Sequence, residues 1–326
     1  MSKSSNQKLK ILYILKILSE MTDEDHPIST SDLIKELSFY DVSAERKSIY
    51  DDLEVLADFG FDIVKISAGK NLYYLGERSL QLPELKLLVD TVQSAKFITH
   101  KKSIELIKKL EGFTSKANAK KLQRQVFVSG RVKTENEQIY YNVDTIHLAI
   151  SENKKISFKY FEWNVEKKQQ FKRNGEEYIQ SPLGLAWDDE NYYLIAYSPE
   201  RGKILHFRVD KMCNIKITDE KICLPEEKFD IAEYTNRTFG MFGGDAEKVT
   251  LELTNDLVGV IIDRFGKDVS IMRSDKEHFI VNLNVSKSPV FLSWLMSFGA
   301  KVKVISPESL IDEVKKTAEE VLNQSK

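Results

Sequence analysis

The sequence predicts a multidomain protein of the α+β class. A chain of 326 residues is longer than one typical hydrophobic core organises, and its composition (42% hydrophobic, 30% charged) is that of ordinary globular domains. Apolar residues recur at helical spacing through the first part of the chain, and short strand-like runs follow between residues 156 and 218. After residue 246, strands and helices alternate. These three patterns predict a helical N-terminal part, a small β barrel and a C-terminal α/β domain.

Residues 1–78 have the element order of a winged helix. Apolar spacing predicts three short helices, at residues 6–22, 29–37 and 43–60. Ser29 and Asp32 have the spacing of a capping box at the start of the second helix, with Asp in place of the usual Glu. Two strand-like runs follow, joined by a turn that contains Gly69. In a winged helix, the third helix would lie in the major groove of DNA, and the hairpin would flank the phosphate backbone.

DNA contacts are expected at the beginning of the third helix. Its polar side chains there project away from the apolar stripe; they are Ser43, Arg46, Lys47, Ser48 and Tyr50. The same helix also carries many carboxylates, namely Glu45, Asp51, Asp52, Glu54 and Asp58. Carboxylates that face phosphates cost affinity. Since residues 1–75 hold nine Lys and Arg against thirteen Asp and Glu, the alternative is a small helical domain that binds no nucleic acid.

For residues 79–142 the sequence predicts a helical connector that begins at Leu82-Pro83. Two apolar stripes run along it, Leu85, Leu88, Val89 and Val92 in the first and Ile104, Ile107 and Leu110 in the second. Residues 96–133 hold eleven Lys and Arg against two acids, a basic block that continues through Lys116, Lys120, Lys121 and Arg124. On charge alone, a solvated helix face is favoured over a phosphate-facing surface. The apolar stripes predict a homodimer, because operator symmetry usually mirrors protein symmetry.

Residues 143–238 predict the barrel, and residues 246–326 the C-terminal domain. A short helix that places His147 on its apolar stripe precedes the strand-like runs, which lie at 156–160, 178–181, 192–197, 204–209 and 215–218. The C-terminal domain has the order βαββαβ, which is typical of a split βαβ, or ferredoxin-like, fold. Between the two domains, Gly240–Gly244 lacks the Lys-Ser/Thr of a phosphate-binding loop, and a flexible joint is predicted instead.

Two segments resemble the WYL family of transcription regulators. Residues 181–197 include Tyr192-Tyr193-Leu194, which stands where that family has the Trp-Tyr-Leu triplet of its name. Residues 206–212 (HFRVDKM) are similar to the family's later Arg-rich strand, although Leu205 stands where relatives often have a further Arg. The resemblance extends over nearly the whole chain. The winged helix, the FGMFGG segment (residues 239–244) and the last third of the chain are similar, in that order, to the family's winged helix, to the joint after its WYL domain and to its C-terminal extension domain.

The resemblance implies a barrel of the Sm/SH3-like type that binds a ligand, often a nucleotide or a nucleic-acid fragment. Strand alternation independently places Tyr193, Ile195 and Tyr197 on one face, and His206, Arg208 and Asp210 on one face of the next run. Aromatic rings beside cations suit base stacking and phosphate contacts. The predicted ligand-binding residues are Tyr193, His206, Arg208, Lys211 and Trp187. Tyr192 and Phe207 are interpreted as barrel core, and Leu205 predicts an altered ligand preference.

Enzyme signals are weak, and no cofactor is expected. The sequence has no nucleophile elbow, Walker loop or zinc-protease motif, and its histidines lack metal-ligand spacing. Cys213 and Cys223, without CxxC spacing, indicate a reducing compartment, and the sequence has neither a signal-like N-terminus nor a membrane-length apolar run. The expected protein is a cytoplasmic bacterial regulator that binds a double-stranded DNA operator and a small anionic or nucleotide-like effector. Two alternatives stay open: a sensor that acts through protein contacts with a vestigial winged helix, and an enzyme that acts on nucleotides in the barrel.

Overall fold

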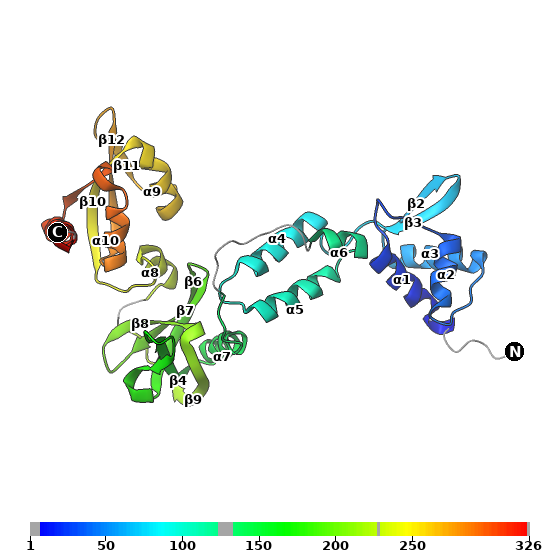
Figure 1. The fold of residues 1–326 in the computed structure, drawn as a ribbon, viewed down its shortest axis with the longest axis horizontal. Coiled ribbons are helices and arrows are strands. Elements are labelled where there is room, and N and C mark those ends of the chain that lie inside the picture. The colour runs from blue at the N-terminus through cyan, green and yellow to red at the C-terminus, as the bar shows by residue number, and fades with distance from the viewer. Residues whose placement is uncertain (1–6, 123–132, 227–228, 325–326) are drawn as a thin grey trace. The chain divides into compact units, whose positions relative to one another are not determined.

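The computed structural model describes residues 7–122, 133–226 and 229–324, and the chain divides into two compact units at residue 137 (Figure 1). Each unit is taken by itself. No helix within the described ranges is long and apolar enough to cross a membrane.

The first unit begins with three helices and a hairpin. After a 3-10 turn, η1 (Gln7–Leu9), come α1 (Lys10–Met21), β1 (Ile28–Ser29), α2 (Thr30–Ser38), α3 (Arg46–Phe59), β2 (Ile63–Ala68) and β3 (Lys70–Leu75). The strands form an antiparallel sheet in the order β1-β3-β2. This is the arrangement that the sequence predicts for a winged helix.

Local sequence accounts for the ends of these helices. Ser29 caps α2 as predicted, since its Oγ accepts a hydrogen bond from the backbone N–H of Asp32 at 3.2 Å. Gly60 ends α3 with a φ of 111°, a left-handed conformation that favours glycine. The apolar stripes of the three helices meet in one core, whose fully buried members include Ile14, Leu33 and Ile49.

The connector consists of α4 (Leu82–Ser94), α5 (His100–Glu111) and α6 (Lys116–Leu122). Lys133 joins α4 to α5: its Nζ donates to the carbonyl oxygens of Val92 (3.2 Å) and Ala95 (2.9 Å) and to Ser103 Oγ (2.9 Å). The ammonium group of Lys133 thus supplies donors to carbonyls at the end of α4, where the helix has no further N–H groups to offer. Arg124, part of the predicted basic block, lies outside the described residues.

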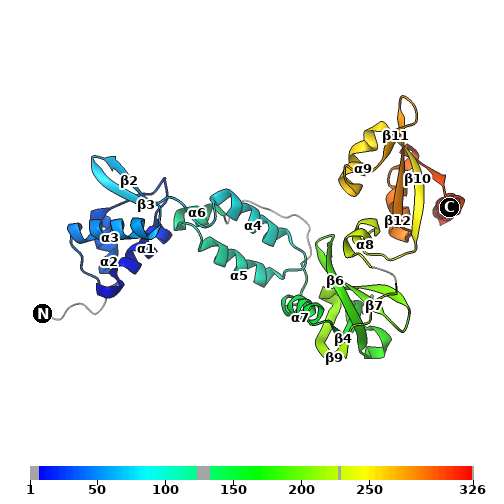
Figure 2. The same cartoon turned by 180° about the vertical axis from the view of Figure 1, so that it is seen from behind.

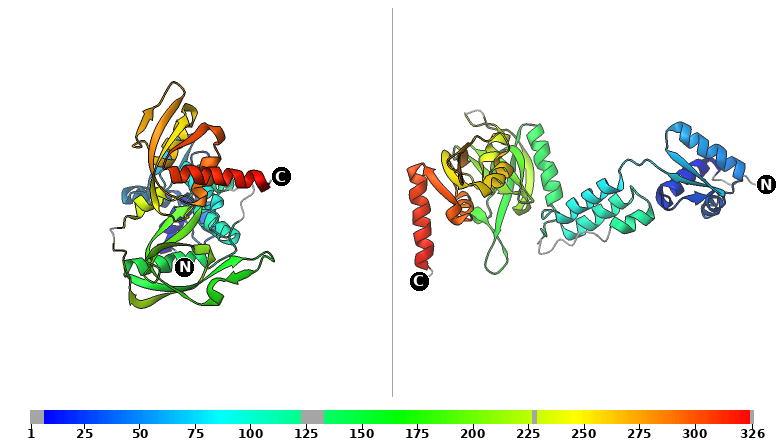
Figure 3. Two further views of the ribbon diagram at one scale, coloured as in Figure 1. Left: turned by 90° about the vertical axis from the view of Figure 1, so that its left-hand side faces the viewer. Right: turned by 90° about the horizontal axis from the view of Figure 1, so that it is seen from above.

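The second unit opens with α7 (Ile139–Ser151) and a curled sheet. The strands are β4 (Lys154–Trp163), β5 (Gln169–Phe171), β6 (Tyr178–Asp188), β7 (Asn191–Ser198), β8 (Lys203–Arg208) and β9 (Met212–Lys221). Their order is β5-β4-β6-β7-β8, with β9 also paired to β4. Figure 3 shows this curled sheet in green. Asn142 ties α7 to the sheet by donating to the Met212 carbonyl at 3.0 Å.

The prediction that His147 packs in the core is wrong. Its side chain is exposed, because the buried face of α7 instead carries Ile139, Asn142, Ile146 and Ala149. Helical spacing alone assigned His147 to the same apolar face as Ile146. That predicted face was one residue too wide, so it included a position that faces solvent.

The C-terminal domain has the predicted βαββαβ order. After α8 (Ile231–Arg237) come β10 (Ala246–Thr254), α9 (Val258–Phe265), β11 (Ile271–Arg273), β12 (His278–Ser286), α10 (Pro289–Met296), β13 (Val302–Ser306) and α11 (Glu308–Gln324). The antiparallel order β11-β12-β10-β13 inserts β12 between β10 and β11, as a split βαβ requires. Ile261 of α9 and Phe291 of α10 share one core with the sheet. Figure 2 shows α9 and the strands β10, β11 and β12 of this domain from behind.

Candidate functional site: a helix start and a barrel cavity

Two basic side chains are exposed at the start of α3. Arg46 and Lys47 occupy its first two positions and are exposed, as is Ser43 before them. The hairpin adds two exposed lysines, Lys65 and Lys70, which the sequence reasoning missed, although they flank the turn at Gly69. A helix N-terminus with nearby cations suits phosphate contacts.

Ser48 is already engaged within the protein. Its Oγ accepts a hydrogen bond from Lys10 Nζ, which also forms an ion pair with Asp52 at 2.6 Å. The same contact neutralises one of the carboxylates that crowd α3. Ser48 is therefore less available for DNA than its neighbours Arg46 and Lys47.

Tyr50 belongs to α3, and its side chain contacts both α2, at Thr30, and the hairpin, at Asn71. Hydrogen bonds with the side chains of Thr30 and Asn71 lower the pKa of Tyr50, assisted by the positive charges of Arg46 and Lys65. The ring is exposed, and its centroid lies 6.4 Å from that of Tyr73. The structure thus groups Tyr50 with Arg46 and with Lys65 of the hairpin.

A cavity of about 1300 Å³ lies against β7 and β8 in the second unit. Four of the five predicted ligand residues line it: Tyr193, His206, Arg208 and Lys211. The strand register explains why they meet, since Tyr193 is paired with Arg208 and Ile195 with His206. Leu205 also lines the cavity.

Trp187, the fifth predicted ligand residue, is not among the side chains that line this cavity. It lies near the end of β6, 49% exposed, with its ring edge-to-face against Tyr192 at 4.8 Å between centroids. Phe207 is buried, as interpreted from the sequence, and its ring packs against Phe158 and Tyr178.

Arg208 does not face the cavity as a free cation. Its guanidinium donates to both carboxylate oxygens of Asp210, at 3.1 and 2.9 Å, and to Asn191 Oδ1 at 2.9 Å. Burial opposes its charge, but the hydrogen bonds and charge of Asp210 raise the pKa of Arg208. Its backbone N–H donates to Tyr160 Oη at 3.3 Å, and burial raises the pKa of Tyr160 to about 12. Arg208 is therefore held as one half of a bidentate ion pair.

His206 is neutral in this environment. Burial lowers its pKa to about 4, although a hydrogen bond with the Met241 backbone opposes that change. Its ring packs against Tyr234 at 5.4 Å between centroids. Nε2 is buried and has no hydrogen-bond partner among the residues that the structure describes. His206 therefore brings an imidazole without charge to the cavity.

The FGMFGG segment packs on both sides, where the sequence predicts a flexible joint. Phe239 is 3% exposed and belongs to the core of the C-terminal domain, with its ring 5.1 Å from that of Phe291. Met241, two residues later, belongs to a buried cluster of the barrel together with Ile195 and Tyr234. The joint is thus a packed connection whose residues insert into both domains.

Sequence reasoning missed Tyr234 and Arg237 of α8, which line the same cavity. Neither lies in a strand, so the alternation that identified the other residues could not find them. Their signal was their position, directly before FGMFGG.

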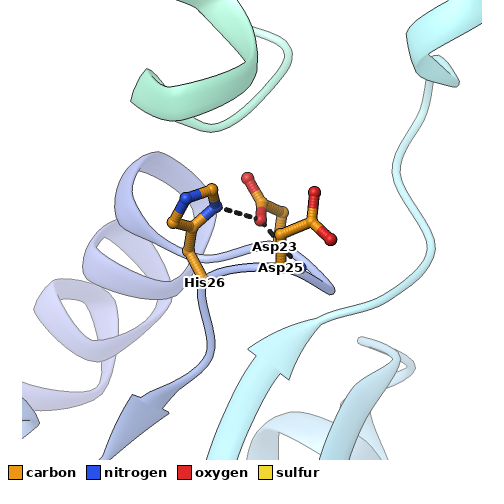
Figure 4. A group of neighbouring side chains, drawn as sticks. All are labelled: Asp23, Asp25 and His26. Atoms are coloured by element: carbon orange, nitrogen blue, oxygen red, sulfur yellow. Dashed lines mark hydrogen bonds and ion pairs between the residues drawn. The ribbon is translucent and has the colours of Figure 1, made fainter.

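A second polar cluster lies in the first unit, on the loop after α1. Asp23 accepts a hydrogen bond from the imidazole of His26 at 2.7 Å, and Asp25 lies beside them (Figure 4). The ligand atoms of these three residues lie within 4.8 Å of one another, a spacing that could hold a metal ion and that sequence reasoning did not recognise.

This cluster also ties α1 to α6. The Ser115 hydroxyl, at the start of α6, donates to Asp23, and Lys121 forms an ion pair with Asp25 at 3.5 Å. Burial opposes ionisation of Asp23, but its hydrogen bonds with Ser115 and His26 hold its pKa below the ordinary value. The carboxylates are thus already used in joining two elements of the first unit.

Comparison with known proteins identifies two domains. Residues 141–217 match the WYL domain, and residues 245–322 match the WCX domain. A search of curated proteins found no match. Among solved structures, the chain is similar to the proteasome accessory factor B/C (PafBC) of Arthrobacter aurescens, at 17% identity and a TM-score of 0.27. The alignment covers 94% of this chain and 45% of that one, so this chain spans less than half the length of that structure.

The chain therefore carries a WYL domain followed by a WCX domain. These domains point to a regulatory rather than a catalytic role. The cavity described above is lined by WYL-domain residues on one side and by the segment leading into the WCX domain on the other.

Proposed function

We propose that this protein is a bacterial transcription regulator whose affinity for an operator is set by a small effector bound at the WYL domain. The observation that carries the proposal is the presence, in one chain, of a WYL domain with a large lined cavity and a three-helix–hairpin unit with exposed cations at the start of α3. The first could supply sensing and the second DNA contact. Such a regulator would act in the cytoplasm, where the free Cys213 and Cys223 would stay reduced.

DNA binding is tested with the exposed pair Arg46 and Lys47. Fluorescence anisotropy with labelled DNA from upstream of the protein's own gene, over a salt series, gives the affinity and its salt slope. If Arg46 is bidentate to a guanine, Arg46→Ala costs about 1–3 kcal/mol and relaxes specificity at that base. If Lys47 contacts phosphate, Lys47→Ala weakens all sequences alike and lowers the salt slope.

The matched control is the double variant Lys315→Ala with Lys316→Ala, on α11. Both side chains are exposed, so this variant removes the same charge from a different unit. Unchanged affinity in the Arg46→Ala, Lys47→Ala double variant would contradict the assignment of α3. A loss that the α11 control shares would point to net charge alone.

A second function is supported by apolar side chains on α2 and α3. Phe39, the C-cap residue of α2, is 71% exposed, and Phe59, the last residue of α3, is 80% exposed; α3 also carries the exposed carboxylates of Asp51, Glu54 and Asp58. An acidic surface with exposed aromatic rings suits a protein partner better than phosphates. In this alternative, the protein senses a ligand and acts through protein contacts, and the wild-type chain shows no salt-dependent DNA binding in the same assay.

The connector helices are proposed to support a homodimer. Leu87 (68% exposed) and Leu88 of α4 and Ile104 (56% exposed) of α5 present apolar surface that the described residues leave uncovered. Multi-angle light scattering at micromolar concentration, with and without DNA, is expected to give twice the mass of one chain. The Leu87→Glu variant is expected to shift the mass toward a monomer, whereas a monomeric wild type under both conditions would contradict the proposal.

A further inference from the structure

Arg237 lies at the cavity of the WYL domain, and its guanidinium pairs with no carboxylate of the residues that the structure describes. It ends α8, lines the cavity and lies over the ring of Tyr234, with Cζ 5.1 Å from the ring centroid. Its Nε is buried and makes no hydrogen bond, and no ion pair of Arg237 is found among the described residues. A half-buried cation in this state lacks the charge partner that usually accompanies burial.

Arg208, which lines the same cavity, presents the opposite case. Asp210 already accepts hydrogen bonds from the Nε and one terminal nitrogen of Arg208, and Asn191 accepts a further one. An anion that approaches Arg208 must compete with a carboxylate 2.9 Å away. An anion that approaches Arg237 displaces no carboxylate from the described part of the chain, and it gives the guanidinium a charge partner.

The other groups of the cavity make Arg237 more important for an anion. His206 is neutral, and the lining contains the carboxylates of Glu162, Glu226 and Asp245 as well as the lysines Lys203 and Lys211. The lining as a whole is therefore close to neutral, so a general attraction for anions is weak. Tyr193 and Tyr197 add aromatic surface to the same space.

We propose that Arg237, rather than Arg208, is the primary anion contact of the effector, and that the Arg208–Asp210 pair is a fixed part of the cavity wall. The proposal rests on the proposed effector site and specifies its ligand as a small molecule with one acidic group, such as a phosphate, and a planar ring. Mononucleotides and short oligonucleotides share this chemistry.

The position of Arg237 connects this contact to both domains. Phe239, two residues later, inserts into the core of the C-terminal domain, and Met241 inserts into the barrel cluster. Arg264 of α9 donates to the Thr238 carbonyl at 2.8 Å, which fixes the same stretch of backbone. An anion held by Arg237 therefore contacts the segment that joins the WYL and WCX domains. A ligand bound there can have different affinities for two arrangements of these domains, and such a difference is what shifts the equilibrium between them.

The test is calorimetry on the full chain with thymidine 5′-monophosphate and 5′-phosphorylated trithymidylate, which separate a mononucleotide from an oligonucleotide source. Thymidine and inorganic phosphate test the ring and the anion alone, and both are expected to bind more weakly than the monophosphate. Arg237→Ala is expected to weaken binding about ten-fold or more, which corresponds to about 1.4 kcal/mol or more. Arg237→Lys keeps the charge but not the planar fork, so its loss is expected to be smaller.

The comparison variant is Arg208→Gln with Asp210→Asn, which removes both charges of the internal pair and keeps hydrogen-bonding side chains in place. Its binding is expected to stay within about three-fold of the wild type. Arg201→Ala, an exposed arginine in the turn before β8, controls for the loss of one positive charge. Urea titrations followed by tryptophan fluorescence establish that each variant is folded, and Arg237→Gln replaces any alanine variant that is not.

Two results would overturn the inference: strong loss in the Arg208/Asp210 double variant with none in Arg237→Ala, or no binding of either phosphorylated probe to the wild type. Neither result decides the proposed DNA binding, because operator affinity of the unliganded protein is measured separately. Loss of operator binding with intact, Arg237-dependent probe binding would instead reject the regulator and retain the site.

Discussion

Protonation of His206 is expected to destabilise the second unit in mild acid. Burial lowers the pKa of His206 to about 4 in the folded protein, against an ordinary value of 6.5 in the unfolded chain. The unfolded chain therefore binds more protons between these two values, and the free energy of unfolding falls as the pH is lowered from 6.5 towards 4. Above pH 6.5 this contribution is fully present, and below pH 4 it falls no further.

The size of the effect follows from the two pKa values. They differ by about 2.5, and one pKa unit corresponds to about 1.4 kcal/mol, so His206 accounts for about 3 kcal/mol of stability lost across this window. The same group contributes no pH dependence between pH 7 and 9. Since single domains are stable by about 5–15 kcal/mol, a loss of this size is measurable.

Urea denaturation of the full chain at pH 7, 5.5 and 4.5 measures the effect. All the tryptophans, Trp163, Trp187 and Trp294, lie in the second unit, so their fluorescence follows that unit. The His206→Gln variant is expected to lose about 2.5 kcal/mol less than the wild type between pH 7 and pH 4.5, because glutamine does not titrate. Carboxylates also titrate near pH 4.5, but they contribute equally to both proteins.

The control is His147→Gln, since His147 lies exposed on α7 and its replacement should leave the pH dependence of the wild type unchanged. Equal pH dependence in the wild type and in His206→Gln would refute the assignment of a buried neutral imidazole. An imidazole resonance of His206 that titrates near pH 6.5 in NMR would refute it independently.

Three further predictions concern packing, and each has a matched control. Gly244→Ala is expected to destabilise the second unit in urea titrations, because a Cβ there would lie 1.9 Å from the Lys287 carbonyl oxygen. The control is Gly259→Ala on α9, where the space around the Cβ is open and alanine should stabilise the unit by up to about 1 kcal/mol. Phe239→Ala is expected to cost about 3–5 kcal/mol in the same assay, and Phe242→Ala, at 56% exposure, less than about 1 kcal/mol; equal costs would contradict the packed joint. Ser115→Ala is expected to cost about 1–3 kcal/mol of stability, because it leaves the buried Asp23 carboxylate with one hydrogen-bond donor fewer. Hydrogen exchange at the α6 amides should become faster in this variant and stay as in the wild type in the control Ser94→Ala; unchanged protection of α6 in Ser115→Ala would reject the Asp23–Ser115 link.

Features that depend on neighbours in the chain were predictable from the sequence. The Ser29 cap and the end of α3 at Gly60 follow from hydrogen bonds and backbone angles within one turn. The βαββαβ order of the last domain followed from alternating periodicities, and the register of β7 and β8 preserved the shared face of Tyr193 and Arg208. In each case the physical cause acts over a few residues, so the sequence alone determined it.

Tertiary structure decided which of these side chains are available. Lys10 engages Ser48, 38 residues away, and Asp23 meets Ser115, 92 residues away. Arg208 donates a hydrogen bond to Asn191, 17 residues away, and Arg237 reaches the cavity only because α8 packs beside the barrel. Charge pairing and desolvation depend on groups that folding brings together from distant positions, and no periodicity records them. The sequence by itself thus determined the order of helices and strands and the strand face that lines the site, whereas only the fold decided which cation of that site has no partner among the described residues.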